Sequence, residues 1–433
     1  MIAKKSGPRI VAVASLVLVV LVASLAAQAQ TVELTHFAYL SAGQAWFDWL
    51  RERAAVFHAQ NPDIVVNVQV SASGSYPDQI AVRLAGGAPP DVTELHTGLA
   101  APFIGQGVFL DLRSLIERDP DVDYEDFTPF VWRGLTAPDG SVWGLPTDIY
   151  PVTTWFNKDM LAEAGLPTPL DLGDSGWTWA AAEEMASKMT RRRADGTTER
   201  YGMDYRLVLR PHIFVTQAGG SFYDRPVQPT ESRWNTPEVV AGLSWIRKFL
   251  ENEWAPPITT PNIAEWYFWN GKTGLDLVDG PGIIGPYLAD TSWDWDVAVQ
   301  PLGPGGRGTE VALDSFQVLA DSPHPEAAWK WIKFLAADVE SQERFVQVTG
   351  RVPSYIPVQP SYPALVPVAP PNWQAFFLAA SDPDAFPTYA IPQASQINAV
   401  TRDPLNQIWR GEIAVEVAVE EIHRLVQAIL AGE

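Results

Sequence analysis

The apolar positions that follow the N-terminal segment predict a strand, a helix and a second strand. An apolar run covers 31–39, and apolar residues then recur every three or four positions over 45–60, which is helical spacing. The sequence Asn-Pro-Asp at 61–63 ends that pattern, and valines alternate with polar residues over 64–70 as in a half-buried strand. We therefore expect a βαβ unit, the building block of a parallel sheet.

Residues 150–166 combine a strand pattern with a helix pattern. Alternation over 152–156 indicates a strand, and the short helix face that follows is ended by Gly165. This junction predicts a buried strand that leaves one compact unit and a helix that begins another.

Three further helices are expected later in the chain. Residues 179–189 follow Thr178, the expected N-cap, and 325–337 begin with Pro325, which suits a first helical position. A final amphipathic helix is expected over 407–430.

Two segments between these helices read as irregular structure. Residues 191–200 are dense in charge and predict a solvated turn. Residues 354–371 are rich in proline, and we expect them to run along the surface of the second half of the molecule.

The composition describes a folded, acidic protein. With 433 residues, of which 47% are hydrophobic and 19% charged, the chain is long enough for two domains. Its net charge of −21 argues against nucleic acid and anionic membrane surfaces as partners. The absence of cysteine excludes disulfides, thiolate metal sites and a lipid-modified N-terminal cysteine. The chain has eighteen tryptophans. We expect about two thirds of them in the core, and the flat faces of the others would suit a sugar site.

The N-terminal segment has the pattern of a secretory signal peptide. Lys4, Lys5 and Arg9 precede an apolar stretch over 10–27, and an Ala-Gln-Ala site ends at Ala29. We expect cleavage after Ala29 and a periplasmic location, with an uncleaved anchor as the alternative.

Several motifs occur in a fixed order along the chain. The sequence 155–166 reads Trp-Phe-Asn-Lys-Asp-Met-Leu-Ala-Glu-Ala-Gly-Leu, and 86–92 reads Gly-Gly-Ala-Pro-Pro-Asp-Val. Others are Asp-Gly-Ser-Val-Trp-Gly-Leu-Pro at 139–146, Phe-Trp-Asn-Gly-Lys at 268–272 and His-Pro-Glu-Ala-Ala-Trp at 324–329. In this order they resemble bacterial extracellular solute-binding proteins of family 1, the sugar-capturing subunits of ABC importers.

The resemblance implies an α/β fold of the type 2 periplasmic binding proteins. Two lobes, each a mixed sheet flanked by helices, would be joined by three crossing segments, placed near 148–154, 294–297 and 349–353. After a signal peptide at 1–29, the first lobe would comprise 30–148 and 295–350. The second would comprise 149–294 and 351–433.

The same resemblance places candidate ligand-binding residues on the loops that border the gap between the lobes. They are Tyr39, Ser41, Glu94, His96, Asp148, Tyr150, Phe222, Asp279, Asp314, Phe316 and Arg351. Each has a plain structural alternative: a capping histidine at 96, core aromatics at 39 and 316, turn-capping acids at 148 and 279, and an interlobe salt bridge at 351.

The implied function is capture of a sugar or oligosaccharide and its delivery to a membrane permease. We expect a monomer that binds carbohydrate and the permease subunits, with no nucleic-acid partner, catalytic residue, metal or cofactor. Binding of a polyamine, peptide or other cation is one alternative, which the acidity would suit. A secreted glycoside hydrolase is another, although no motif selects a pair of carboxylates. A metalloenzyme is disfavoured because the six histidines show no metal-ligand spacing.

Overall fold

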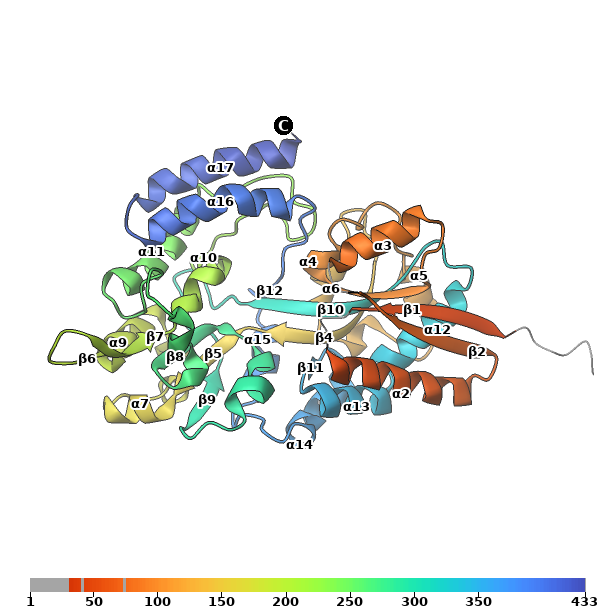
Figure 1. The fold of residues 1–433 in the computed structure, drawn as a ribbon, viewed down its shortest axis with the longest axis horizontal. Coiled ribbons are helices and arrows are strands. Elements are labelled where there is room, and N and C mark those ends of the chain that lie inside the picture. The colour runs from red at the N-terminus through yellow and green to blue at the C-terminus, as the bar shows by residue number, and fades with distance from the viewer. Residues whose placement is uncertain (1–30, 40–42, 73–74, 433) are drawn as a thin grey trace, which may run out of the picture.

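The structure, a computed structural model, describes residues 31–39, 43–72 and 75–432 (Figure 1). Residues 1–30 and Ser41 lie outside the described residues, so the signal peptide and the role of Ser41 stay predictions. No helix in the described part has both the length and the apolar character that a membrane crossing requires.

Two sheets organise the chain. The larger has seven strands, in the order β11-β4-β10-β3-β1-β2 with β12 beside β10, and the smaller has five, in the order β6-β7-β8-β5-β9. The strands of the larger sheet are β1 (Val32–Ala38), β2 (Ile64–Val70), β3 (Val92–His96), β4 (Leu145–Pro151), β10 (Glu310–Val318), β11 (Val352–Pro353) and β12 (Phe386–Pro387). Those of the smaller sheet are β5 (Thr153–Asn157), β6 (Arg191–Arg192), β7 (Thr198–Met203), β8 (Thr273–Asp279) and β9 (Trp295–Ala298).

The predicted βαβ unit is confirmed. Strands β1 and β2 are parallel and paired over their whole length, with α2 (Gln44–Gln60) between them. Strand β3 runs parallel to β1 on its other side, so β1 and β3 end at the same edge of the sheet. In open α/β sheets this carboxyl edge is where ligands bind.

Strands β4 and β10 carry the chain between the two sheets (Figure 1). Strand β4 ends at Pro151 in the larger sheet and β5 begins at Thr153 in the smaller one, so that Val152 alone separates them. Strand β10 lies antiparallel between β3 and β4 and opens at Glu310, directly after the connection from β9. Side chains at the start of β10 therefore sit where the two halves meet.

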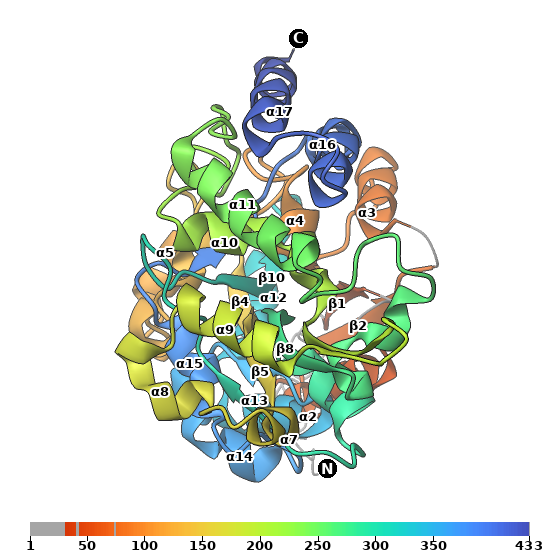
Figure 2. The same ribbon diagram turned by 90° about the vertical axis from the view of Figure 1, so that its left-hand side faces the viewer.

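Helices cover both sheets. Those beside the larger sheet include α3 (Tyr76–Ala85), α4 (Thr97–Ala100), α5 (Arg113–Arg118), α6 (Val131–Leu135), α12 (Pro325–Ala336) and α13 (Val339–Thr349). Those that follow β5 are α7 (Lys158–Glu163), α8 (Pro169–Gly176), α9 (Trp179–Met189), α10 (Pro211–Gln217) and α11 (Pro237–Glu251). The chain ends with α14 (Tyr362–Leu365), α15 (Gln374–Ala380), α16 (Ala394–Trp409) and α17 (Val415–Ala431). Figure 2 shows α10, α11, α16 and α17 gathered on one side of the molecule.

Short helical turns complete the elements. They are η2 (Tyr124–Asp126), η3 (Tyr205–Leu209), η4 (Ile263–Trp266), η5 (Phe268–Asn270), η6 (Pro281–Ile283), η7 (Ile284–Leu288) and η8 (Ile356–Ser361).

Each half has its own apolar core. One buried cluster includes Trp49 and Trp331 around the larger sheet and extends to Trp155 of the smaller sheet, and the other includes Phe214 and Phe249 around the smaller sheet. Local signals set the helix bounds within them. Asn157 caps α7 by accepting the Met160 N–H, and Thr178 caps α9 as predicted.

Four sequence expectations are corrected by the strand pairing and helix breaks. The 191–200 segment is not a plain turn, because it forms β6 and the start of β7. The single C-terminal helix over 407–430 is two helices, α16 and α17, separated at Gly411, whose φ is +73°. The proline-rich 354–371 segment packs against α13 of the larger half rather than on the second half. The fourth correction concerns the crossings predicted at 294–297 and 349–353, because the chain passes between the sheets later than each of these positions.

The positions of those crossings follow from the sheet to which each strand belongs. Strand β9, which contains the predicted crossing at 294–297, pairs with β5 in the smaller sheet. The chain therefore returns to the larger sheet only at β10. At 349–353 the chain adds β11 to the larger sheet by pairing with β4, and it leaves that sheet after β12.

Candidate functional site

Four adjoining cavities lie where the two sheets meet, and together they form a cleft. The central chamber of about 760 Å³ and the helical chamber of about 550 Å³ share Glu310 and Thr388. A niche of about 200 Å³ shares His96, Asp314 and Arg351 with the central chamber. An arginine chamber of about 360 Å³ shares Glu310 with the central and helical chambers.

The niche is built at the carboxyl edge of β1 and β3. Glu94 accepts the Tyr39 N–H at 2.7 Å through one carboxylate oxygen and the Trp46 indole N–H at 2.6 Å through the other. The carboxylate is 5% exposed and both of its oxygens are engaged. Glu94 therefore positions the end of β1 and the Trp46 ring.

His96 caps a helix and also lines the cleft. Its Nδ1 accepts the Gly98 N–H at 3.1 Å and so caps α4, while the ring lines both the niche and the central chamber. An accepting Nδ1 carries no proton, so in the neutral ring the proton sits on Nε2. His96 Nε2 is thus a hydrogen-bond donor in the cleft wall.

Two carboxylates hold an arginine at the centre of the cleft. Strand pairing sets Asp314 opposite Asp148, and Arg351 donates to both, at 2.8 Å to Asp314 and 3.3 Å to Asp148. The guanidinium also lies 5.1 Å from the centre of the Trp46 ring. Arg351 is thereby fixed by charge and by an aromatic face.

Asp148 is the more perturbed of the two acids. It is 4% exposed, and its Oδ1 has no hydrogen-bond partner. Burial, with a further contribution from Asp314, raises the pKa of Asp148 to about 7, although Arg351 opposes the shift. A buried oxygen without a partner at the cleft wall is suited to a hydroxyl group brought by a ligand.

Tyr150 lies across a glycine loop of the smaller-sheet half. A Cβ built on Gly280 would be 2.5 Å from the Tyr150 ring, and one on Gly282 would be 2.8 Å from it. The two glycines therefore make room for the ring, which lines the central chamber beside them. Burial raises the pKa of Tyr150 to about 12, and the nearby charge of Asp279 is the second cause of the shift. The hydroxyl therefore keeps its proton.

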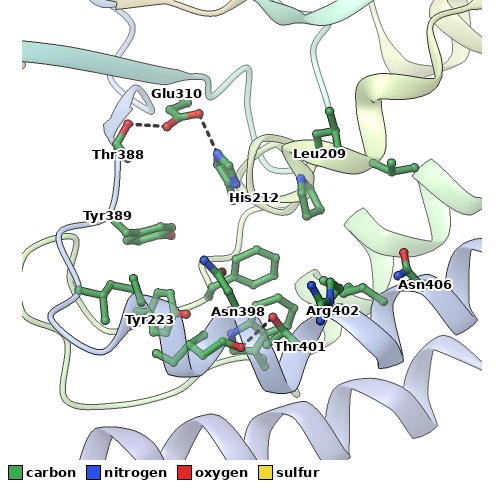
Figure 3. A pocket seen from close by; sticks show the side chains of 18 of the residues that line it. Leu209, His212, Tyr223, Glu310, Thr388, Tyr389, Asn398, Thr401, Arg402 and Asn406 are labelled. Atoms are coloured by element: carbon green, nitrogen blue, oxygen red, sulfur yellow. Dashed lines mark hydrogen bonds and ion pairs between the residues drawn. The ribbon is translucent and has the colours of Figure 1, made fainter. Parts of the chain in front are cut away.

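Glu310 joins the chambers and ties the two halves together (Figure 3). Its carboxylate accepts from Thr388 at 2.5 Å and from His212 at 2.9 Å, and it forms an ion pair with Arg210. Burial alone would raise the pKa of Glu310, but His212 and Arg210 outweigh burial and hold the pKa well below its usual range. Glu310 is an ionised, fully engaged anchor.

The helical chamber pairs aromatic rings with a polar ridge (Figure 3). Asn398, Arg402 and Asn406 line it from α16, and their spacing of four residues puts them on one face of the helix. Tyr223 and Tyr389 line the chamber from the loops that face this ridge. The chamber offers hydrogen-bonding groups beside apolar ring surface.

The structure thus brings together seven of the predicted site residues at the niche and central chamber. They are Tyr39, Glu94, His96, Asp148, Tyr150, Asp314 and Arg351.

Three other predicted residues lie elsewhere. Phe222 lines the helical chamber, stacked on Trp234 with ring centres 3.7 Å apart. Asp279 lines the arginine chamber and forms an ion pair with Arg206. Phe316 does not reach the cleft, because it is 0% exposed and packed under the helix α2 that carries Trp46 and Trp49.

The sequence reasoning missed most of the second wall. Arg210, His212, Glu310, Thr388, Tyr389 and the polar ridge of α16 were not singled out. A usable signal was present for two of them, because Arg210 and His212 flank Pro211 at the first turn of α10. The ridge was hidden because the helix was expected to begin at 407, after it.

The acids that line the cleft are already matched by donors or cations. Asp148 and Asp314 share Arg351, while Glu310 has Arg210 and Asp279 has Arg206. The cleft is therefore rich in hydrogen-bonding groups, and its arginines are already engaged by acids, which disfavours a strongly anionic ligand.

Comparison with known proteins finds a family model that covers most of the chain. The model of a family described as bacterial extracellular solute-binding protein matches residues 40–340. The galactooligosaccharide-binding protein of Bacillus subtilis is 21% identical over 320 residues, which are 70% of this chain and 69% of that protein.

Two solved structures share the fold over nearly the whole chain. The cyclic alpha-maltosyl-1,6-maltose binding protein of Arthrobacter globiformis has a TM-score of 0.77 and 18% identity, covering 93% of this chain and 100% of the other. An ABC substrate-binding protein of Listeria monocytogenes, solved in complex with cycloalternan, has a TM-score of 0.73 and 24% identity, covering 93% and 99%.

Proposed function

Because the chain belongs to the family of bacterial extracellular solute-binding proteins, we propose that it captures a neutral sugar or oligosaccharide for an ABC importer. The ligand is held in the cleft, released unchanged and passed to membrane permease subunits. The protein acts outside the cytoplasm as a monomer.

The observation that carries this proposal is the pairing of polar groups with aromatic faces around one cleft. A sugar loses water from every hydroxyl when it is enclosed, so each hydroxyl needs a protein partner. His96 Nε2, the free Asp148 oxygen and the α16 ridge supply such partners. Tyr150 and Tyr389 supply ring faces for the apolar side of the sugar. The relatives named for oligosaccharides support the same ligand class.

The two sheets provide the two lobes that such capture requires. We propose that the first lobe comprises 31–151 and 310–387 and the second comprises 153–298 and 394–432, as the strand pairing favours. Ligand would draw the lobes together by rotation about the segments that join them.

Thermal-shift measurements against a broad carbohydrate panel test this function. Binding to the folded state raises the melting temperature in proportion to the logarithm of ligand concentration over Kd. We expect at least one mono- or oligosaccharide to raise it and to make the protein more compact in small-angle X-ray scattering. A panel without any shift, alongside shifts from polyamines or peptides, would refute the carbohydrate assignment.

The acid pair at the cleft centre raises one alternative function, the hydrolysis of glycosidic bonds. Asp148, with its raised pKa, and Asp314 could be taken for the general acid and the second carboxylate of a glycoside hydrolase. Arg351 donates to one oxygen of each acid, however, which gives the pair a structural role in fixing that guanidinium. We expect the bound oligosaccharide to be recovered intact after prolonged incubation. Release of shorter sugars would establish the hydrolase instead.

A further inference from the structure

Four aromatic side chains form a continuous group outside the cleft chambers, and we call it the aromatic platform. Tyr205 stacks on Tyr267 with ring centres 5.9 Å apart and planes 10° from parallel. Tyr267 meets Trp269 edge-on at 4.8 Å, and Trp269 stacks on Tyr287 at 4.4 Å and 11°. Residues from η3, η5 and η7, together with Tyr267 directly before η5, thus form one group.

Arg206 fixes the platform in place from beneath. Its guanidinium lies 4.8 Å from the Tyr267 ring centre and 4.3 Å from that of Trp269. The same guanidinium bonds Asp204 at 2.9 Å and forms ion pairs with Asp276 and Asp279. A buried cation held by three carboxylates has little freedom, so the rings that rest on it are preorganised.

The platform is continuous with the cleft at two points. Arg206 and Asp279 line the arginine chamber, and Pro286, which directly precedes Tyr287, lines the central chamber. The platform therefore adjoins the central chamber along the chain at 286–287 and adjoins the arginine chamber through its contact with Arg206.

Tyr287 is the ring that the platform leaves open. Its side chain is 51% exposed, whereas Trp269 is covered by Tyr287 and by Arg206. A tyrosine stacked on a fixed tryptophan presents a flat, rigid face, and such faces bind the apolar side of a pyranose ring.

We propose that the aromatic platform is an outer sugar subsite, with Tyr287 as its contact residue. The ligand is accordingly an oligosaccharide long enough to extend from the central chamber onto Tyr287, rather than a mono- or disaccharide. This inference rests on the proposed carbohydrate function and adds the chain length of the ligand and the place of its outer unit.

Chain-length dependence of binding in Tyr287 variants tests the proposal. The probes are a disaccharide and a tetrasaccharide from each of the malto-, galacto- and arabino-oligosaccharide series, with Kd measured by calorimetry. Tyr287→Ala is expected to weaken the tetrasaccharide of the binding series by about threefold to tenfold, the range that one aromatic contact provides. Binding of the disaccharide is expected to stay unchanged, because it does not leave the chambers.

Two control variants separate a subsite from a structural effect. Tyr287→Phe keeps the ring and is expected to keep tetrasaccharide affinity. Leu378→Ala removes a similarly exposed apolar side chain from α15 and is expected to change neither ligand. Melting temperatures of all three variants check that each is folded.

The possible results divide cleanly. Equal effects of Tyr287→Ala on the short and long ligands, or no effect on either, would overturn the platform proposal while leaving the carbohydrate function intact. Failure of every oligosaccharide series to bind the unaltered protein would instead refute the proposed function, and the platform proposal with it.

Discussion

The buried acids of the cleft show how single residues set its chemistry. Asp148 lies on β4 where it faces Asp314, and burial raises its pKa to about 7 while Arg351 opposes the shift. Glu310, equally buried, has its pKa held low because His212 and Arg210 both face it. Burial is common to both acids, but Asp148 also faces the like charge of Asp314, whereas Glu310 faces His212 and Arg210, so the neighbouring groups decide which acid stays ionised.

Asp148 gives the protein a predictable pH dependence. The folded form keeps this proton up to about pH 7, whereas the unfolded chain releases it near pH 4. Between these values the folded state binds more protons, so the free energy of unfolding falls as pH rises. Asp148→Asn should make that decline shallower, by up to the equivalent of one proton, in urea unfolding followed from pH 4.5 to 7.

The matched control is Asp321→Asn, an exposed acid outside the cleft. Its slope should equal that of the unaltered protein. Identical slopes for both variants would show that Asp148 titrates normally.

Sequence reasoning located side chains at strand ends better than side chains within strands. Tyr39 and His96 were expected at the cleft because Tyr39 follows β1 and His96 ends β3, and parallel strands share a carboxyl edge. Asp314 and Phe316 both lie in β10, two positions apart, and both were expected to line the cleft. Only the packing of α2 over Phe316 distinguishes them, and that contact depends on tertiary structure.

At the scale of elements, β10 is the strand on which the site depends. It carries Glu310 at its start and Asp314 further along, so one strand supplies the anchor of the two halves and an acid of the cleft centre. Its pairing with β3 on one side and β4 on the other fixes both side chains relative to the carboxyl edge.

Loss of the Glu310 charge should weaken the junction between the halves. Glu310→Gln would leave the mostly buried Arg210 without a counter-charge, and we expect the free energy of unfolding to drop by about 2–3 kcal/mol. Urea denaturation at pH 7 measures the change. Glu117→Gln, at an exposed position, should change stability by less than about 0.5 kcal/mol. A similar small change in Glu310→Gln would remove the anchor role.

Helices with clear ends were predicted, and helices with internal breaks were not. The α9 and α12 helices have a threonine cap and an initial proline, and both were placed closely. The α16 helix contains Pro404 and ends before Gly411, so its pattern was interrupted and its start was missed. The chamber ridge was lost with it, because residue roles follow from element bounds.

At the scale of the whole molecule, a loop of the smaller-sheet half reaches the larger-sheet half. Gln228 donates from its side chain to the Ile104 carbonyl at 2.5 Å, and its backbone N–H donates to the Ala390 carbonyl. The φ of Gln228 is +49°, an uncommon value for a side-chain-bearing residue. The contact is therefore one of those that link the two halves.

Removing this contact should shift the molecule toward a more open form. Gln228→Ala keeps the Cβ and therefore the backbone strain, but loses one hydrogen bond of about 1 kcal/mol. We expect a larger radius of gyration without ligand in small-angle scattering and ligand affinity lowered by about fivefold.

Gln396→Ala on the exposed side of α16 serves as the control and should match the unaltered protein. An unchanged radius in Gln228→Ala would show that other contacts set the spacing of the halves.

The two-lobed arrangement was foreseeable from the ordered motifs, while the exact crossings were not. In the sequence, β9 and β11 both resemble crossing segments. In the structure, β9 pairs within the smaller sheet and β11 within the larger one. Only hydrogen-bond partners, which the sequence does not state, assign them.

The tyrosine laid over two glycines also limits how this cleft can diverge. A Cβ at position 280 or 282 would strike the Tyr150 ring, so neither glycine is free to vary while that ring remains. Loss of the ring, in turn, would open a void over the loop that a new side chain at 282 could fill. Position 280 stays restricted even then, because a Cβ there would also lie 2.7 Å from the Pro151 carbonyl oxygen. A new side chain at this wall therefore requires replacement of Tyr150 and Gly282 together rather than one substitution at a time.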